Sequence, residues 1–312
     1  MKRLFLSILA VMVSLPVICA ESLIDKSTVV YTVHDDVDTL KMDVYKPATD
    51  GVNRRSMIFA FGGGFSGGQR DAEHYMQYFE YLVNQGYVVF SIDYRLGLKD
   101  VPITTLEAYV PKLANAITMA VEDFITATAY VVQNKDTFGI DPNGIIACGS
   151  SAGAITSLQS EFLIANGNPL VTTVLPSGFN YAGVVSFAGA LCSIGEAPRF
   201  ATKPCPMMLW HGDADDTVPF NALEIPGVAG LYGSQYISDV LVEAGAPHCL
   251  YVLDGANHSV STSPMTDNLD EISNFLRTFV DKKSQRIEIM HQITPGAPRN
   301  YKKDFTITDF LH

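Results

Sequence analysis

The chain has 312 residues, of which 47% are hydrophobic and 17% charged, and its formal net charge is −12. This composition excludes a disordered chain. At ~100–200 residues per domain, the length allows either two domains or one large α/β domain with extensions. The negative charge argues against binding to nucleic-acid phosphates or to an anionic membrane surface, because both need a positive protein surface.

The N-terminus has the pattern of a secretory signal. Two basic residues precede an apolar run over 4–18, and Ala20 provides a small residue at a cleavage site. The run is short and contains Pro16, which disfavours a retained membrane span. Cys19 leaves lipid anchoring as an alternative. We therefore predict that residues 1–20 are removed and that the mature chain is exported, periplasmic or secreted. Its charge becomes −14, because two basic and no acidic residues are lost.

Four cysteines remain in the mature chain: Cys148, Cys192, Cys205 and Cys249. Export permits disulfides, and four cysteines allow three complete pairings. Cys148 lies inside an apolar strand, where a thiol usually acts as a small buried hydrophobic group. Cys192 and Cys205 are the closest of the others in sequence, so they are the pair we favour for a bridge.

Strand-like and helix-like segments alternate from residue 28 onward. We expect strands over 29–33, 40–45 and 56–61, a helix over 72–84, a strand over 87–92, a helix over 112–134, and a strand over 145–148 that leads into a helix from Ala152. We then expect strands over 183–188 and 207–210, a helix over 235–243, a strand over 250–253 and a helix over 268–280. Successive β-crossover-β units predict an α/β fold with a mainly parallel sheet and helices on both faces.

No linker divides this alternation, and the residues after Lys283 have no clear periodicity. We therefore predict a signal peptide over 1–20, one α/β domain over 21–283 and a C-terminal tail on the domain surface over 284–312.

The segment Gly149-Ser150-Ser151-Ala152-Gly153 is a G-x-S-x-G motif that follows an apolar strand and opens a helix. A nucleophile on such a sharp turn needs tiny neighbours, because the two backbones approach closely there. We predict that Ser151 is a nucleophile at the carboxyl edge of the sheet and that Ser150 is only a turn residue.

A nucleophilic serine needs a base and an orienting carboxylate. Where this motif occurs, the order along the chain is Ser, then Asp or Glu, then His, each after a later strand. His258 lies beyond the last expected strand and before the last helix, so we predict that it is the base. Three carboxylates compete for the acid, all in the loop after the strand at 207–210: Asp213, Asp215 and Asp216. His211 is also in that region, but we expect it to be structural.

The tetrahedral intermediate of acyl transfer needs hydrogen-bond donors. Gly62-Gly63-Gly64 follows a strand, and glycines let successive N–H groups turn toward one point. We predict an oxyanion hole formed by the N–H groups of Gly63, Gly64 and Ala152.

Together these motifs resemble the α/β-hydrolase superfamily, and within it the serine carboxylesterases related to hormone-sensitive lipase and to bacterial feruloyl and acetylxylan esterases. The resemblance covers roughly residues 40–280, with these landmarks: Phe61-Gly62-Gly63-Gly64-Phe65, Asp93-Tyr94-Arg95, Phe138-Gly139-Ile140-Asp141-Pro142, Gly149 to Gly153, His211-Gly212-x-x-Asp215-x-x-Val218-Pro219 and Gly255-x-x-His258. In such families the aspartate of the His-Gly motif is the triad acid, which implies Asp215. Phe61 is a departure, because the family's glycine motif usually begins with a histidine that supports the loop.

The resemblance implies a serine esterase without metal or cofactor that acts on a small-molecule or glycan ester, such as an acetyl or feruloyl group on a plant polysaccharide. Only about 60 residues separate Ser151 from the acid loop, which leaves little room for a large lid and favours short acyl groups. Two alternatives remain: a peptidase of the prolyl oligopeptidase kind, and a catalytically silent α/β-hydrolase fold that binds glycans or proteins.

Overall fold

The computed structural model describes residues 24–35, 38–49, 51–102 and 105–293. The expected signal segment at 1–20, Cys19 and the end of the predicted tail lie outside the described residues. Among the described residues no helix is both long and apolar enough to cross a bilayer.

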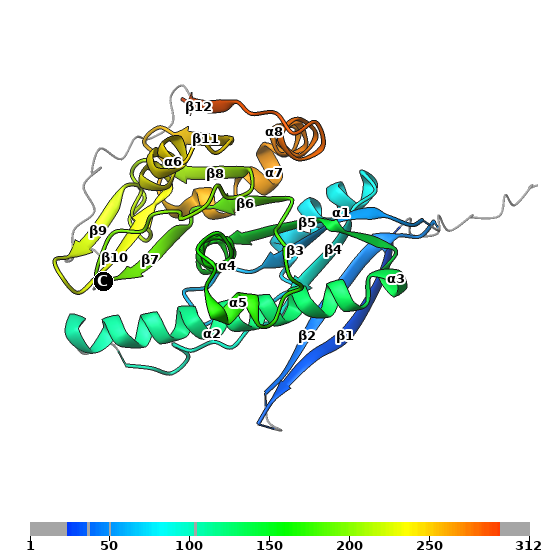
Figure 1. The fold of residues 1–312 in the computed structure, drawn as a ribbon, viewed down its shortest axis with the longest axis horizontal. Helices are drawn as coiled ribbons and strands as arrows, with labels where there is room; N and C mark the ends of the chain where they lie inside the picture. Colours follow the sequence, from blue (N-terminus) through cyan, green and yellow to red (C-terminus); the bar gives the residue numbers. More distant parts are fainter. Residues whose placement is uncertain (1–23, 36–37, 50, 103–104, 294–312) are drawn as a thin grey trace, which may run out of the picture.

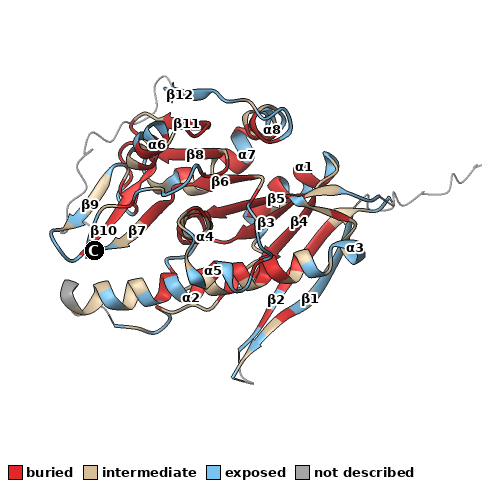
Figure 2. Ribbon diagram, viewed as in Figure 1, coloured by how far each residue is buried: buried red, intermediate tan, exposed pale blue. Residues whose placement is uncertain are grey.

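The described residues form a nine-stranded sheet in which only β2 runs against the others (Figure 1). Its strands, in spatial order, are β1 (Ile24–His34), β2 (Asp38–Pro47), β4 (Val88–Ile92), β3 (Arg54–Ala60), β5 (Ile140–Ser150), β6 (Gly183–Phe187), β8 (Met207–Gly212), β11 (His248–Leu253) and β12 (Ile287–Gln292). Every residue of β4, β6 and β8 is buried, as expected for parallel strands covered on both faces (Figure 2).

Helices cover both sides of the sheet, with α2, α4 and α6 on one side and α1, α7 and α8 on the other (Figure 1). The helices are α1 (Met76–Asn84), α2 (Leu106–Gln133), α3 (Lys135–Phe138), α4 (Ala152–Ala165), α5 (Pro169–Thr172), α6 (Ser234–Glu243), α7 (Pro264–Asp267) and α8 (Leu269–Phe275). Short 3₁₀ turns lie at η1 (Glu73–Tyr75) and η2 (His258–Ser261), and α8 continues as a π-helical turn, η3 (Leu276–Asp281). The α/β architecture expected from the sequence is confirmed.

A second, three-stranded antiparallel sheet was not expected. It contains β7 (Ala190–Ile194), β10 (Ala229–Gly233) and β9 (Ala222–Ile225), in that spatial order. These strands lie in the connections that follow β6 and β8, so the small sheet stands beyond the carboxyl ends of the main strands. The small sheet therefore lies on the side of the molecule where active sites of open α/β sheets are found.

Helix α2 begins six residues before the expected start at residue 112. Thr105 caps it, since the Thr105 hydroxyl oxygen accepts a hydrogen bond from the N–H of Ala108 at 3.3 Å. Pro111 is accommodated inside the helix rather than marking its start.

The prediction of a surface tail over 284–312 is wrong for its first part, because Ile287–Gln292 forms strand β12 and pairs in parallel with β11. None of the six residues is buried, and the side chain of Ile289 is 50% exposed. Its apolar residues Ile287 and Ile289 face solvent, and only Met290 packs against the core, so this edge strand has no clear buried face to mark it in the sequence.

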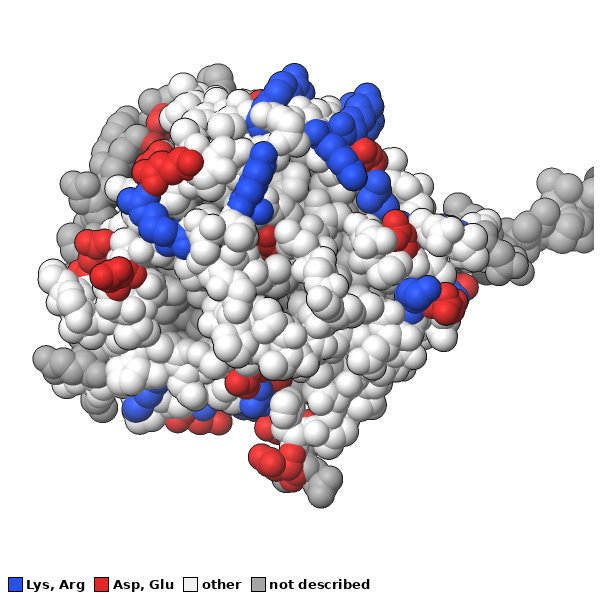
Figure 3. Space-filling view, in the orientation of Figure 1, with Lys and Arg blue, Asp and Glu red and all other residues white. Residues whose placement is uncertain are grey.

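The net negative charge is unevenly distributed. Figure 3 shows Lys and Arg side chains gathered toward the end of the molecule that carries α8 and β12. Several ion pairs hold loop arginines to neighbouring elements: Arg70 pairs with Asp43 of β2 and with Asp93, and Arg95 pairs with Asp123 of α2.

Glu161, on α4, is a fully buried carboxyl group whose oxygen accepts the N–H of Cys205 at 2.8 Å. Burial raises the pKa of Glu161 from its ordinary value near 4.5 to about 7. The pKa of this carboxyl group is higher in the folded chain than in the unfolded one. The free energy of unfolding therefore falls as pH rises from about 4.5 to 7, and it stays lower above pH 7.

We therefore predict that Glu161→Gln stabilises the protein at pH 8 by on the order of 3 kcal/mol, and by less than about 1 kcal/mol at pH 5. The oxygen of the introduced amide keeps the bond to the N–H of Cys205, so packing changes little. Urea unfolding at both pH values measures the effect, with Glu80→Gln at an exposed position of α1 as control. An equal increase in the free energy of unfolding at pH 5 and pH 8 would show that ionisation of Glu161 is not the cause.

Candidate active site

Ser151 lies at the turn between β5 and α4. Its backbone has φ 51° and ψ −116°, a conformation that non-glycine residues rarely adopt, and the turn is held by a 2.8 Å bond from Ser151 N–H to Phe187 O. A Cβ at Gly149 would collide with the backbone of Gly153, and one at Gly153 would collide with the carbonyl group of Ala60. The glycines of the motif are thus required by close packing of three backbone segments.

His258 opens η2, after the loop that follows β11. Its Nε2 atom is 2.8 Å from Ser151 Oγ, and its Nδ1 atom is 2.8 Å from Asp215 Oδ2. The carboxylate of Asp215 has no proton to donate, so the Nδ1 atom of His258 must carry one and donate it. The Nε2 atom is then unprotonated and can accept the hydrogen bond of the Ser151 hydroxyl. The structure thus brings together the predicted nucleophile, base and acid.

Asp215 is buried, with 5% of its surface exposed, and is held from several directions. Asp215 Oδ1 accepts the N–H groups of Thr217 and Val218, both at 2.9 Å. Burial alone would raise the pKa of Asp215, but hydrogen bonds from His211 and His258 outweigh it and keep this pKa well below its usual range. The carboxylate therefore stays ionised beside His258.

The two competing carboxylates point elsewhere. Asp213 Oδ1 accepts the N–H of Gly255 at 2.6 Å, and Asp216 is exposed to solvent. Asp213 supports the loop before His258, whereas Asp216 makes a long contact of 3.4 Å with the hydroxyl of Thr217.

His211 is fully buried at the end of β8 and contacts the acid alongside His258. Its Nε2 atom lies 3.2 Å from Val218 O and 3.3 Å from Asp215 Oδ2, and its Nδ1 atom lies 2.8 Å from Ser234 Oγ. Both neighbours of Nε2 are acceptors, so Nε2 carries the proton. We expected His211 to be structural, and its contact with the carboxylate of Asp215 shows which group it supports.

Two of the three predicted oxyanion residues, Gly63 and Gly64, line the same pocket as Ser151 and His258, whereas Ala152 is not among its lining residues. Gly63 and Gly64 have φ values of 135° and 61°, and the carbonyl oxygen of Gly63 accepts the N–H groups of Ser66 and Gly67 in a tight turn. Ala152 is the first residue of α4, where an N–H group has no partner within the helix. Gly62 differs, because its N–H is taken by the hydroxyl of Tyr75 at 3.0 Å.

Ser151, His258 and the glycines at 62–64 line a pocket of about 460 Å³. Among the described residues that line it there is no Lys, Arg, Asp or Glu: Gly62, Gly63, Gly64, Gly68, Gln69, Ala72, His74, Tyr75, Ser150, Ser151, Thr217, His258, Ser261 and Thr262. The pocket therefore fits an uncharged group next to Ser151 better than a charged one.

Several lining residues were not predicted from the sequence, above all Tyr75, which helical spacing marks only as a core aromatic. Ser150, predicted to be only a turn residue, donates its hydroxyl to Ser261 O at 2.8 Å. Its polar side chain next to Ser151 was the signal in the sequence. In the part of the chain that the structure describes, no cluster of His, Cys, Asp and Glu side chains is suited to hold a metal ion.

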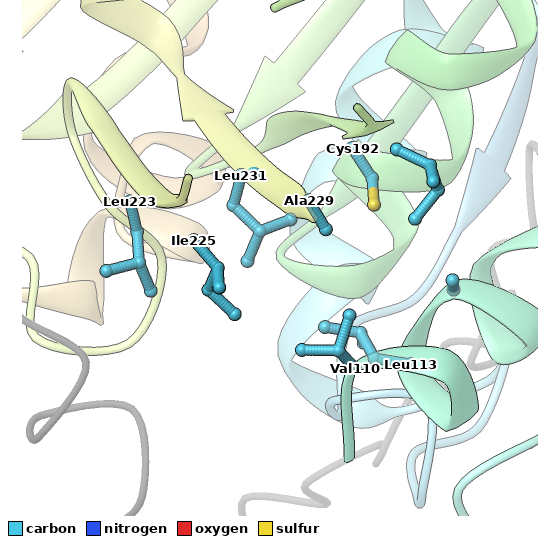
Figure 4. Close-up of a pocket in the computed structure, with 10 residues that line it drawn as sticks. Val110, Leu113, Cys192, Leu223, Ile225, Ala229 and Leu231 are labelled. Atoms are coloured by element: carbon cyan, nitrogen blue, oxygen red, sulfur yellow. The ribbon is translucent and has the colours of Figure 1, made fainter. Parts of the chain in front are cut away.

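A second, narrow pocket of about 40 Å³ lies between the first turns of α2 and the small sheet (Figure 4). Apolar side chains line it, including Val110, Leu113, Cys192 and Leu231, and none of the predicted site residues does.

The predicted bridge between Cys192 and Cys205 is wrong, because all four cysteines at 148, 192, 205 and 249 are free thiols. Cys192 faces this apolar pocket, whereas Cys205 is buried next to Glu161. Cys148 is fully buried, as expected for a small hydrophobic group in β5.

Comparison with known proteins gives a consistent result. The family model described as BD-FAE matches residues 42–167. The chain is 31% identical over 120 residues to fumonisin B1 esterase of Sphingopyxis macrogoltabida, a stretch that is 38% of this chain and 22% of that protein. It is 29% identical over 118 residues to juvenile hormone esterase of Tribolium castaneum, 38% of this chain and 19% of that protein. The chain thus spans only about a fifth of the length of these two curated relatives.

Among solved structures, the apo form of Thermogutta terrifontis esterase 2 superposes with a TM-score of 0.60. The match has 24% sequence identity and covers 81% of this chain and 94% of that one. The propionate-bound form of the same esterase gives a TM-score of 0.60 at 22% identity, with the same coverage. The fold is therefore the α/β-hydrolase fold, and the resemblance to α/β-hydrolase carboxylesterases expected from the sequence is confirmed.

Proposed function

We propose that this protein is a serine esterase that hydrolyses uncharged carboxylic esters with short acyl or aryl groups. The observation that carries the proposal is the continuous series of contacts from Ser151 Oγ through His258 to Asp215, in a pocket without charged lining residues among those described. The esterase names of the sequence relatives and of the structural neighbour support the same reaction class.

The reaction follows from this arrangement. His258 Nε2 takes the proton of the Ser151 hydroxyl as Oγ attacks the ester carbonyl, and Asp215 stabilises the resulting imidazolium. The N–H groups of Gly63, Gly64 and Ala152 donate to the oxyanion of the tetrahedral intermediate. His258 then gives the proton to the departing alcohol. Water, activated by the same imidazole, hydrolyses the acyl-enzyme and restores Ser151.

For the natural substrate we propose an acetyl or feruloyl ester on a plant polysaccharide. The pocket of about 460 Å³ has room for an acetyl or an aryl acyl group, and its amide and hydroxyl groups, from Gln69, Thr217 and Thr262, suit a hydroxyl-rich alcohol. The BD-FAE match over 42–167 and the similarity to esterases are compatible with this substrate class.

Steady-state kinetics on p-nitrophenyl acetate, p-nitrophenyl butyrate and a peptide p-nitroanilide test the activity. We expect hydrolysis of both esters, little cleavage of the amide, and a loss of at least about 10³-fold in kcat in Ser151→Ala. Faster cleavage of the amide would favour a peptidase of the prolyl oligopeptidase kind. No turnover of any substrate would favour a silent binding protein, and acetylated and feruloylated oligosaccharides then serve as binding probes.

The acid assignment has its own test. We predict that Asp215→Asn lowers kcat by about 10³- to 10⁴-fold with a small change in KM, because His258 loses the partner that sets its tautomer. The matched control is Asp216→Asn, which alters an exposed carboxylate in the same loop and should stay within about twofold of the wild type. The reverse ranking of the two variants would overturn the assignment of Asp215.

We also propose that residues 1–20 are an export signal preceding one catalytic domain. Expression of the full chain in a Gram-negative host, followed by mass spectrometry of the extracytoplasmic protein, should give Glu21 as the first residue. A lipid-modified Cys19 at the N-terminus would instead establish the anchored alternative. Retention of the intact signal in a cytoplasmic product would contradict export.

A further inference from the structure

We propose that Tyr75 is a positioning residue that aligns the glycine loop with Ser151. The proposal rests on the proposed esterase function, since it concerns the donors that stabilise the tetrahedral intermediate. Tyr75 lies in η1, outside the sequence motifs that define the site, and its side chain lines the pocket.

One hydrogen bond and the close packing of its partner connect Tyr75 to the elements of the site. The Gly62 N–H donates to the Tyr75 hydroxyl oxygen at 3.0 Å. Gly62 itself lies against the turn that carries Ser151, since a Cβ at Gly62 would come within 3.0 Å of Ser150 Oγ and 3.3 Å of Ser151 Cβ. The Ser150 hydroxyl donates to Ser261 O at 2.8 Å.

These contacts join three segments that are far apart in sequence. Gly62 precedes the predicted oxyanion donors, Ser150 precedes the nucleophile, and Ser261 ends the turn that His258 opens. By holding the N–H of Gly62, the tyrosine fixes the start of the glycine loop against the turn that carries Ser151. Burial raises the pKa of Tyr75, so its phenol stays protonated and can both donate and accept.

The ring of Tyr75 has little freedom to move. Only 3% of its surface is exposed, and its ring packs edge-on against Phe59, with centroids 4.7 Å apart. It also stacks on Phe79 at 6.1 Å. A hydroxyl on a ring fixed in this way holds its partners in place.

The head of the glycine motif needs such support, because Phe61 has no polar side-chain atom. The Phe61 ring instead stacks on Tyr94 at 4.5 Å, and the Tyr94 hydroxyl donates to Phe61 O at 2.8 Å. Two tyrosines thus hold adjacent backbone groups, the carbonyl of Phe61 and the N–H of Gly62. Tyr75 is the one of the two that also lines the pocket.

The test compares Tyr75→Phe with Tyr78→Phe. Tyr78 is fully buried on α1, about one helical turn further along, and its hydroxyl contacts only the sulfur atoms of Met57 and Cys148 among the described residues. Each variant loses one buried hydroxyl, but only Tyr75→Phe frees the loop. The probe is p-nitrophenyl acetate, with a trifluoromethyl ketone as an analogue of the tetrahedral state.

We expect Tyr75→Phe to lower kcat by about 10- to 100-fold with KM within about twofold, somewhat less than the loss of an oxyanion donor itself. Affinity for the ketone should fall by a similar factor, while Tyr78→Phe keeps wild-type kcat and shows a comparable melting temperature. Ser150→Ala, which removes the bond to Ser261 O on the other side of the same packing contact, should show the same kinetic pattern with a smaller loss.

If Tyr75→Phe retains kcat and ketone affinity within about twofold of the wild type, or is matched by Tyr78→Phe, Tyr75 has no positioning role. That result is distinct from failure of the proposed function, in which the wild-type protein itself would not hydrolyse the ester.

Discussion

Gly153 packs directly against the carbonyl group of Ala60, and this approach of two backbones is the constraint on which the site depends. It brings the first turn of α4 against the end of β3, so that Ser151 and the glycine loop meet at one edge of the sheet. Any side chain at Gly153 would separate them. The positive φ of Ser151 is the local cost of the same arrangement, because only a sharp turn lets the helix start so close to the strand.

The remaining parts of the site are held by hydrogen bonds around this contact. Asp215 receives bonds from two backbone N–H groups and from two imidazoles, which keeps its carboxylate ionised and immobile. His258 is fixed between Asp215 and Ser151, and the turn that it opens is linked back to Ser150 through Ser261 O. The pocket is thus built from groups that are set before a substrate enters, as electrostatic stabilisation of a transition state requires.

The strand-helix alternation and the order Ser, Asp, His were sufficient to predict the α/β fold and the residues that meet at its edge. Buried parallel strands such as β4 and β8 give unbroken apolar runs, and a motif that needs Gly149 and Gly153 leaves a clear local pattern. Strand β12 gives no such signal, because its side chains are not buried. The small sheet depends on contacts between distant segments, which no local pattern encodes. The same holds for the positioning role that we propose for Tyr75. The prediction of a Cys192–Cys205 bridge was wrong for the same reason. Nearness in sequence does not decide whether two thiols meet, and here Cys192 lines the apolar pocket whereas Cys205 is buried beside Glu161.

We propose that His258 activates Ser151 to act as a nucleophile. Peptide mass spectrometry after brief exposure to paraoxon tests this activation directly, because an organophosphate traps an activated serine without needing the natural substrate. We expect one diethylphosphoryl adduct, on Ser151, and a labelling rate that falls by at least about 10²-fold in His258→Asn. No adduct on Ser151 in the wild type, or labelling at the same rate without the imidazole, would contradict it.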